Sequence, residues 1–280
     1  MACINGSAGP ILSVVIANYN YGRFLPYAIE SVVRQNIPEV ELIIVDGGSA
    51  DNSVEVIKKY EKDIAWWCSE KDKGQSDAFN KGFAHARGRF LTWLNADDVF
   101  LPGSLQAVVN SIRKYPTCEW FTGNYLRFDS SGRVLEVCWG PHWYPKLLQR
   151  RNSPIVSFGP STFFSRRIYE LAGRVDEELH YVMDNDLWLK FMTLGIKQRR
   201  VNQFCYGFRM HEASKTAEFG EHGLSDRAAL ALAKEACLIR DRLGYHESTM
   251  LRFLVRVVRV LDGSFIRRCW YKLTMRKVEF

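Results

Sequence analysis

The sequence predicts an α/β domain built on a largely parallel sheet, with a helical extension at its carboxyl end. Over the first 100 residues, short apolar runs alternate with amphipathic helical patterns, which is typical of βαβ units. The 280 residues are 47% hydrophobic and 13% aromatic, enough to bury a sizeable core. From about residue 224 onward the pattern becomes helical and increasingly basic, so we expect a soft boundary there.

The elements of the first 60 residues follow in order. Residues 12–17 are apolar and β-branched, which predicts a buried strand, and residues 24–35 show the apolar spacing of a helix. Residues 41–45 predict the second strand. The next segment, residues 47–52, is a turn rich in capping residues, so the following helix should begin there and run through Tyr60.

The next elements change in character. A helix is expected over about residues 75–86, leading into a strand over residues 90–94. Residues 120–128 and 134–139 flank Ser130-Ser131-Gly132, which predicts a hairpin added in antiparallel fashion to the sheet. The expected sheet is therefore mixed.

Composition and charge exclude several classes of protein. No stretch approaches the roughly 18 apolar residues of a membrane span, and residues 1–10 lack the features of a secretion signal. The seven cysteines contain no CxxC pair, so we expect reduced thiols, no cysteine-ligated zinc and a cytoplasmic location. The net charge of +7 lies largely in the carboxyl-terminal tail.

Polar residues follow three predicted strands at the point where each strand ends. They are Asn18-Tyr19-Asn20, Asp46-Gly47-Gly48-Ser49 and Asn95-Ala96-Asp97-Asp98. Open α/β sheets bind ligands at the carboxyl ends of their strands. We therefore expect one ligand site to contain all three segments.

These segments belong to a longer series that resembles glycosyltransferase family 2, an inverting family with the GT-A fold. The series is VVIANYN (14–20), IVDGGSAD (44–51), DKGQSDAFNKG (72–82), LNADD (94–98), DNDLWL (184–189) and RMHEASKT (209–216). The resemblance implies a Rossmann-like mixed sheet with flanking helices over residues 1–224. Its nucleotide-sugar half would span about residues 11–100 and its acceptor half about 101–224, with residues 225–280 as a basic amphipathic extension.

The implied activity is that of a hexosyltransferase. It would move a sugar from a nucleotide diphosphate donor, with UDP favoured, to a hydroxyl of a glycan or lipid-linked acceptor in bacterial cell-surface polysaccharide assembly. Two alternatives stay open. A nucleotide-sugar binding module with impaired catalysis is suggested by Asn95, where Asp is commoner, and a sugar-phosphate nucleotidyltransferase would need a glycine-rich loop that Asn18–Gly22 does not provide.

The two adjacent aspartates after the third of these strands offer a metal site. Asp97 and Asp98 supply hard oxygen ligands for Mn²⁺ or Mg²⁺, and such a cation neutralises a departing diphosphate. Alternation would send Asn95 and Asp97 to one side and Asp98 to the other. The resemblance implies that Asp97 binds the metal, that Asn95 faces the ribose or metal, and that His211 completes the metal shell. The alternatives are loop-capping aspartates and a lone exposed histidine.

Other residues would hold the donor. The resemblance assigns the base to Asp46, with Ala17 and Tyr19 lining its pocket; the alternatives are a turn-stabilising Asp46 and a core Tyr19. Diphosphate contacts are expected from the helix start at Gln75 and Asp77, whose amides favour anions, and from the cations Arg209 and Lys215. Asp77 is equally compatible with a simple helix-start role.

A helix over residues 184–194 offers two candidates for the general base. Asp184 shares its face with Leu187, Trp188 and Phe191, whereas Asp186 lies four residues before Lys190 and can pair with it at the surface. Asp184 is therefore expected to point inward, and the resemblance selects the same residue as the base. The alternative is an aspartate that merely favours the helix start.

The tail is a separate feature. Residues 252–277 combine arginines and lysines with apolar residues at helical spacing, as in helices that lie on anionic membranes. Packing on the domain with a solvated basic side is the alternative. Nucleic-acid binding is not expected, because no known nucleic-acid module accompanies the charge. A peripheral contact with the inner face of the cytoplasmic membrane is therefore a prediction.

Overall fold

A parallel run of four strands forms the first part of the sheet. The computed structural model describes residues 9–140, 159–212 and 226–243. In it β1 (Leu12–Asn18) pairs in parallel with both β2 (Val40–Asp46) and β4 (Phe90–Asn95), and β2 pairs in parallel with β3 (Trp66–Ser69). The predicted strands at residues 12–17, 41–45 and 90–94 are thus confirmed. The short β3 was not predicted.

The rest of the sheet is mixed. The predicted hairpin is confirmed as β6 (Trp120–Asp129) with β7 (Val134–Cys138). β8 (Thr162–Ser165) is antiparallel to β4 and β6, and β9 (Gln198–Met210) is parallel to β6. β5 (Val99–Phe100) is antiparallel to β9. The order in the described residues is β3-β2-β1-β4-β8-β6-β9-β5, with β7 beside β6.

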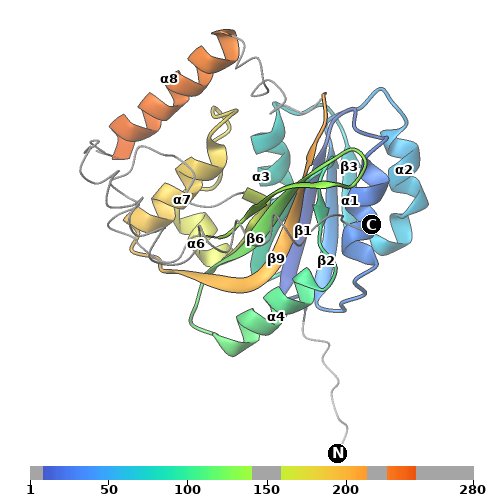
Figure 1. The fold of residues 1–280 in the computed structure, drawn as a ribbon, viewed down its shortest axis with the longest axis horizontal. Coiled ribbons are helices and arrows are strands. Elements are labelled where there is room, and N and C mark those ends of the chain that lie inside the picture. Colours follow the sequence, from blue (N-terminus) through green and yellow to red (C-terminus); the bar gives the residue numbers. More distant parts are fainter. Residues whose placement is uncertain (1–8, 141–158, 213–225, 244–280) are drawn as a thin grey trace, which may run out of the picture.

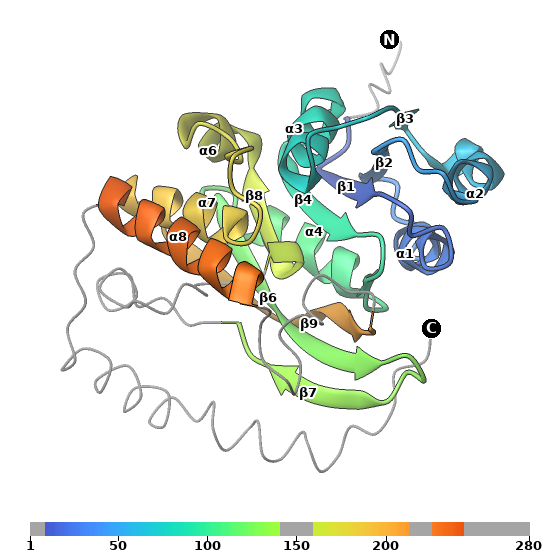
Figure 2. The same ribbon diagram turned by 90° about the horizontal axis from the view of Figure 1, so that it is seen from above.

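Helices cover both faces of this sheet (Figures 1 and 2). One core lies between the sheet and the helices α1 (Leu25–Val33), α2 (Ser53–Lys59) and α4 (Ser104–Lys114). The other lies under α3 (Gln75–His85), α6 (Arg166–Leu171) and α7 (Met183–Thr193). Successive residues of β1 alternate between the two cores: Val14 and Ile16 belong to the first and Val15 to the second. An apolar strand covered on both faces is what a parallel sheet requires.

The last described helix, α8 (Asp226–Leu243), packs beside α7 (Figures 1 and 2). Its Ile239 is buried in the second core, so this part of the predicted extension is joined to the domain. The basic segment predicted to meet a membrane, residues 252–277, lies outside the described residues. Within the described ranges, no helix is long and apolar enough to cross a bilayer, and all five cysteines are free: Cys68, Cys118, Cys138, Cys205 and Cys237.

Candidate active site

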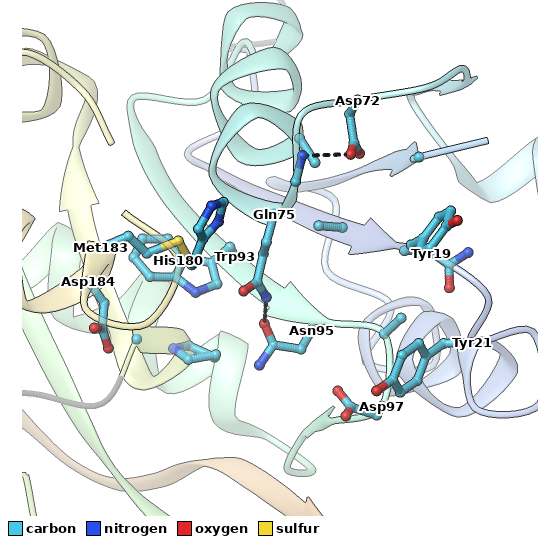
Figure 3. Close-up of a pocket in the computed structure, with 18 of the residues that line it drawn as sticks. Tyr19, Tyr21, Asp72, Gln75, Trp93, Asn95, Asp97, His180, Met183 and Asp184 are labelled. Carbon is cyan, nitrogen blue, oxygen red and sulfur yellow. Dashed lines mark hydrogen bonds between the residues drawn. The ribbon is translucent and has the colours of Figure 1, made fainter. Parts of the chain in front are cut away.

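A pocket of about 730 Å³ opens at the carboxyl ends of β1, β2 and β4 (Figure 3). This volume is typical of small-molecule sites. Its wall brings together predicted residues from strand ends and from the starts of two helices: Ala17, Tyr19, Gln75, Asn95, Asp97 and Asp184. The strand-end segments and the α7 helix therefore share one cavity, as the sequence led us to expect.

At one end of the pocket, Asp97 meets His211 although 114 positions separate them. The Nε2 atom of His211 lies 3.0 Å from Oδ2 of Asp97. The pairing of β5 with β9 explains this meeting, because Val99 opposite Gly207 brings the end of β9 beside the loop after β4. The His211 ring packs 4.4 Å from the Phe24 ring and only 5% of its side chain is exposed. His211 is therefore held in place, unlike a lone surface histidine.

This pair fits a divalent cation. Adjacent ligand atoms of an octahedral site with bonds of about 2.1 Å lie about 3 Å apart, which is the separation found between Asp97 and His211. Among the described residues no group of three or more His, Cys, Asp or Glu side chains is arranged to hold a metal. The remaining ligands would therefore come from a diphosphate and water, as is usual for Mg²⁺ in nucleotide sites.

Asp98 occupies a different position, and its predicted role as a metal ligand is not supported. Its side chain is fully buried and does not line the pocket. Its carboxylate accepts hydrogen bonds from the Tyr206 hydroxyl, from the Arg209 backbone N at 2.9 Å and from Asn95 Nδ2 at 2.8 Å. Burial, reinforced by the Asp97 charge, raises the pKa of Asp98 well above its usual value. Asp98 thus organises the loop that presents Asp97.

A series of hydrogen bonds connects Asp98 to the pocket through Asn95 and Gln75. Because Asn95 Nδ2 donates to Asp98, its Oδ1 is left to accept from Gln75 Nε2, at 2.7 Å. Figure 3 shows the two amides meeting in the middle of the site. Because the Nε2 atom of Gln75 donates to Asn95, its Oε1 atom is the acceptor that the Gln75 side chain can offer a ligand.

Asp46 does not line the pocket, so its predicted contact with the base is not supported. The residue is fully buried. Its Oδ1 accepts from Asn18 Nδ2 at 2.6 Å and from Ser49 Oγ at 2.5 Å, while its Oδ2 accepts from Ser49 N at 3.0 Å and from Ser69 Oγ at 2.6 Å. With four donors from its own chain, Asp46 has the turn-stabilising role.

Asp72 supplies a carboxylate to the pocket wall instead, a role that was not predicted from the sequence. It approaches Gly47 so closely that a Cβ there would fall 2.6 Å from its Oδ2. The pKa of Asp72 is raised above its usual value. Burial is the main cause and the charge of Asp77 adds to it, while the hydrogen bond from the Gly74 N–H opposes it. Tyr19, 60% exposed, lies on the same side and is no core residue (Figure 3). Ala17 lines the wall as well.

Asp77 and Arg209, two residues predicted to contact the nucleotide sugar, lie away from the cavity. The Asp77 carboxylate accepts from the Lys73 backbone N at 3.0 Å, which is a helix-start role. Arg209 is buried behind the loop, where its Nε donates to the Asp97 carbonyl at 2.9 Å and its guanidinium lies 4.8 Å from the Phe128 ring centre. Neither residue lines the pocket, so their predicted contacts with a diphosphate are not supported. Lys215 lies outside the described residues.

Asp184 lies across the pocket from Asp97 (Figure 3). Its Oδ1 accepts from the Asn185 backbone N at 2.7 Å. Asp186 points away from the cavity and pairs with Lys190 at 2.6 Å, as predicted, but its side chain is only 1% exposed. The expected surface location was therefore wrong. Burial raises the pKa of Asp186, and Lys190 lowers it only in part.

Several other pocket residues were not identified from sequence: Tyr21, Trp93, Pro160, His180 and Met183. Burial, together with the charges of Asp97 and Asp98, raises the pKa of Tyr21 to about 12, so it stays a hydroxyl donor. Trp93 stacks on Trp188 of α7 with ring centroids 5.4 Å apart. Tyr21 directly follows the predicted motif Asn18-Tyr19-Asn20, so a signal lay next to it, whereas Trp93 and Met183 resemble ordinary core residues in sequence.

The family model for glycosyl transferase family 2 matches residues 13–171. The chain is 23% identical over 204 residues to a chondroitin synthase of Escherichia coli, an alignment that covers 72% of this chain and 29% of that protein. The alignments span 60% or less of the length of these curated relatives, the chondroitin synthase among them.

Solved structures share the fold, and two of them hold a nucleotide sugar. A mannosyltransferase from Pyrobaculum calidifontis in complex with GDP-Man and Mn²⁺ matches with a TM-score of 0.56 at 16% identity, covering 95% of this chain and 84% of that one. S. aureus TarS 1–349 in complex with UDP-GlcNAc matches with a TM-score of 0.57 at 17% identity, covering 74% and 60%. The mixed sheet with flanking helices is thus the GT-A fold that the resemblance implied.

Proposed function

The chain belongs to glycosyl transferase family 2, and from this premise we propose that it transfers a sugar from a nucleotide diphosphate donor to an acceptor hydroxyl, inverting the anomeric centre. One observation carries the proposal. A single pocket has Asp97 at one end, with His211 in contact behind it, and the Asp184 carboxylate at the other end. A cation site for the leaving diphosphate and a carboxylate base on opposite sides of one cavity are what a direct displacement needs.

The donor would lie along the strand ends. Its base would meet the exposed Tyr19 ring, with the Asp72 carboxylate as acceptor for an imide N–H, which favours a uracil base. The Gln75 Oε1 atom would accept from a hydroxyl of the ribose or sugar. The sugar ring would occupy the part of the cavity near Trp93 and Met183, next to Asp184.

Asp97 and His211 would hold a Mn²⁺ or Mg²⁺ ion at the diphosphate. Such an ion, when bound, neutralises charge on the leaving diphosphate. The P. calidifontis mannosyltransferase, with Mn²⁺ and GDP-Man in its structure, supports this use of a cation. Tyr21, protonated up to about pH 12 beside Asp97, adds a hydroxyl donor at the same end of the pocket.

Asp184 would take the proton of the acceptor hydroxyl. As that proton moves to the carboxylate, the acceptor oxygen forms a bond to the anomeric carbon, and the bond from this carbon to the diphosphate oxygen breaks on the opposite side. The hydrogen bond from Asn185 N to Oδ1 holds the carboxylate in place. General-base catalysis of this kind contributes typically about 10²- to 10⁴-fold.

The acceptor would be a glycan or lipid-linked glycan, in assembly of a bacterial surface polysaccharide. The chondroitin synthase among the relatives supports a polysaccharide product. A peripheral membrane contact, suggested by the basic residues 252–277, would bring a lipid-linked acceptor within reach.

A screen of nucleotide sugars by thermal shift, with and without Mn²⁺, tests the donor. The true donor should raise the melting temperature by mass action, and only when the cation is present. Donor hydrolysis and transfer measured on the same samples distinguish an active enzyme from a binding module. Stabilisation by a donor with no transfer to any glycan or lipid-linked acceptor would favour the impaired binding module.

A further inference from the structure

The helix that carries Asp184 begins without a side-chain cap of its own. Its N-cap residue, Val182, has no side chain able to accept a hydrogen bond from the first helical amides. Glu235 of α8 fills this role for the turn before the helix. Its carboxylate accepts from the backbone N of His180 at 3.0 Å, of Tyr181 at 2.8 Å and of Val182 at 3.2 Å. Hydrogen bonds to a charged acceptor are about twice as strong as neutral ones.

Two other residues on the same face of α8 reinforce this contact. Ile239 and Arg242 follow Glu235 by four and seven positions, which places all three on one side of the helix. Ile239 is buried in the second core, and Arg242 forms ion pairs with Asp176 and, at 3.7 Å, with Glu178. α8 therefore holds residues 176–182 at both ends.

The opposite side of residues 176–182 is held by α3. Ser76 Oγ donates to the Leu179 carbonyl at 2.9 Å, and next to this segment Asn80 Nδ2 donates to the Val175 carbonyl at 2.9 Å. This segment and the residues after it supply the pocket wall around the base: His180, Tyr181, Met183 and Asp184. A loop that would ordinarily be mobile is thus fixed between two helices.

We propose that Glu235 is a positioning residue for Asp184, and that α8, which lies beyond the 13–171 family match, is part of the catalytic machinery through this contact. Glu235 does not line the pocket, so it acts by fixing the turn that carries the base. The inference rests on the proposed role of Asp184. Because displacement of a catalytic group by about 1 Å can cost about 100-fold in rate, a contact this far from the chemistry can control turnover.

The test compares Glu235→Ala and Glu235→Gln with Asp241→Asn, which removes an acidic charge from an exposed position of the same helix. We expect Glu235→Ala to lower kcat roughly 10- to 100-fold while the Kd of the donor stays within about twofold, because the residues proposed to bind the base and the diphosphate, Tyr19, Asp72 and Asp97, lie on other segments. Glu235→Gln keeps one acceptor oxygen, so it should recover part of the lost rate. Amide hydrogen exchange over residues 178–183 should accelerate in Glu235→Ala and stay unchanged in Asp241→Asn.

Three outcomes would overturn the inference: a kcat for Glu235→Ala within twofold of wild type, equal losses in donor affinity and turnover, or unchanged exchange over residues 178–183. If Glu235→Ala does not fold, the same criteria apply to Glu235→Gln, which is nearly isosteric. The proposed function fails separately. Wild-type turnover in Asp184→Asn would refute the base, whereas an inactive Asp184→Asn beside a fully active Glu235→Ala would refute only the positioning role.

Discussion

Two aspartates at the start of α7 allow a catalytic role to be distinguished from a structural one. Asp184 lines the pocket, whereas Asp186 is buried beside Lys190 and faces away from it. We expect Asp184→Asn to lose transfer while keeping donor binding and stability. An asparagine retains an oxygen to accept from Asn185 N, so the hydrogen bond at 2.7 Å can persist and only the ability to take a proton is lost.

The expected magnitude follows from that loss. Removing a general base should slow transfer by about 10²- to 10⁴-fold, which corresponds to about 2.7 to 5.4 kcal/mol in the activation barrier. Asp186→Asn should leave kcat unchanged. It should also change the free energy of unfolding by less than about 1 kcal/mol, because burial outweighs the attraction of Lys190 and a neutral isostere carries no such penalty.

Initial rates at saturating donor, calorimetry with the donor and chemical denaturation of both variants decide the matter. The control is the donor Kd, which should be the same in wild type, Asp184→Asn and Asp186→Asn. An Asp184→Asn enzyme with wild-type turnover, or a folded but inactive Asp186→Asn enzyme, would show that the base has been assigned to the wrong residue.

Three other predictions concern the metal, the base end of the pocket and the buried ion pair. Asp97→Ala should abolish chelator-sensitive donor binding measured by calorimetry and most transfer; full wild-type activity in excess chelator would contradict the metal assignment. Gly47→Ala should displace the Asp72 carboxylate, which leaves no room for a Cβ, and weaken donor binding by roughly tenfold, about 1.4 kcal/mol, with kcat spared; unchanged affinity would exclude Asp72 from the base site. Lys190→Met should cost about 2 to 3 kcal/mol at pH 7 by leaving the Asp186 carboxylate buried and unpaired. Burial raises the pKa of Asp186 above its unfolded value. The contribution of this residue to stability is therefore complete below the unfolded pKa and is lost as the pH rises through the folded pKa. The loss of stability in Lys190→Met, measured by denaturation, should thus be smaller at pH 4 than at pH 7.

The parallel half of the fold could be predicted because strands covered on both faces must be apolar along their whole length. Residues 12–17, 41–45 and 90–94 carry that signal without help from the rest of the chain. β3 could not be predicted in the same way, since it has only four residues and none is fully buried. That omission had a consequence for Asp46, because Ser69 at the end of β3 is one of the donors that occupy its carboxylate.

Two of the misplaced site residues, Asp98 and Arg209, share one cause. The two-residue β5 leaves no pattern in the sequence, yet its pairing with β9 determines that Arg209 lies behind Asp97 and that Tyr206 reaches Asp98. Asp186 was expected at the surface for a similar reason. The helical pattern of α7 does not reveal that other parts of the chain, with Asp176 and Arg242 close enough to act on its charge, lie on that side.

The pairing of β5 with β9 also bears on when the site comes into being during synthesis. The parallel strands β1 to β4 and the Asp97 loop leave the ribosome more than 100 residues before His211, and the contact between them closes a loop of 114 residues. Closing so long a loop is entropically costly and slow compared with forming the local βαβ units. The β1 to β4 unit can therefore assemble before Asp97 and His211 come into contact. A nascent chain can thus form the Tyr19 side of the pocket before β9 brings His211 to Asp97, and on the proposed function it would bind the cation only after β9 has joined the sheet.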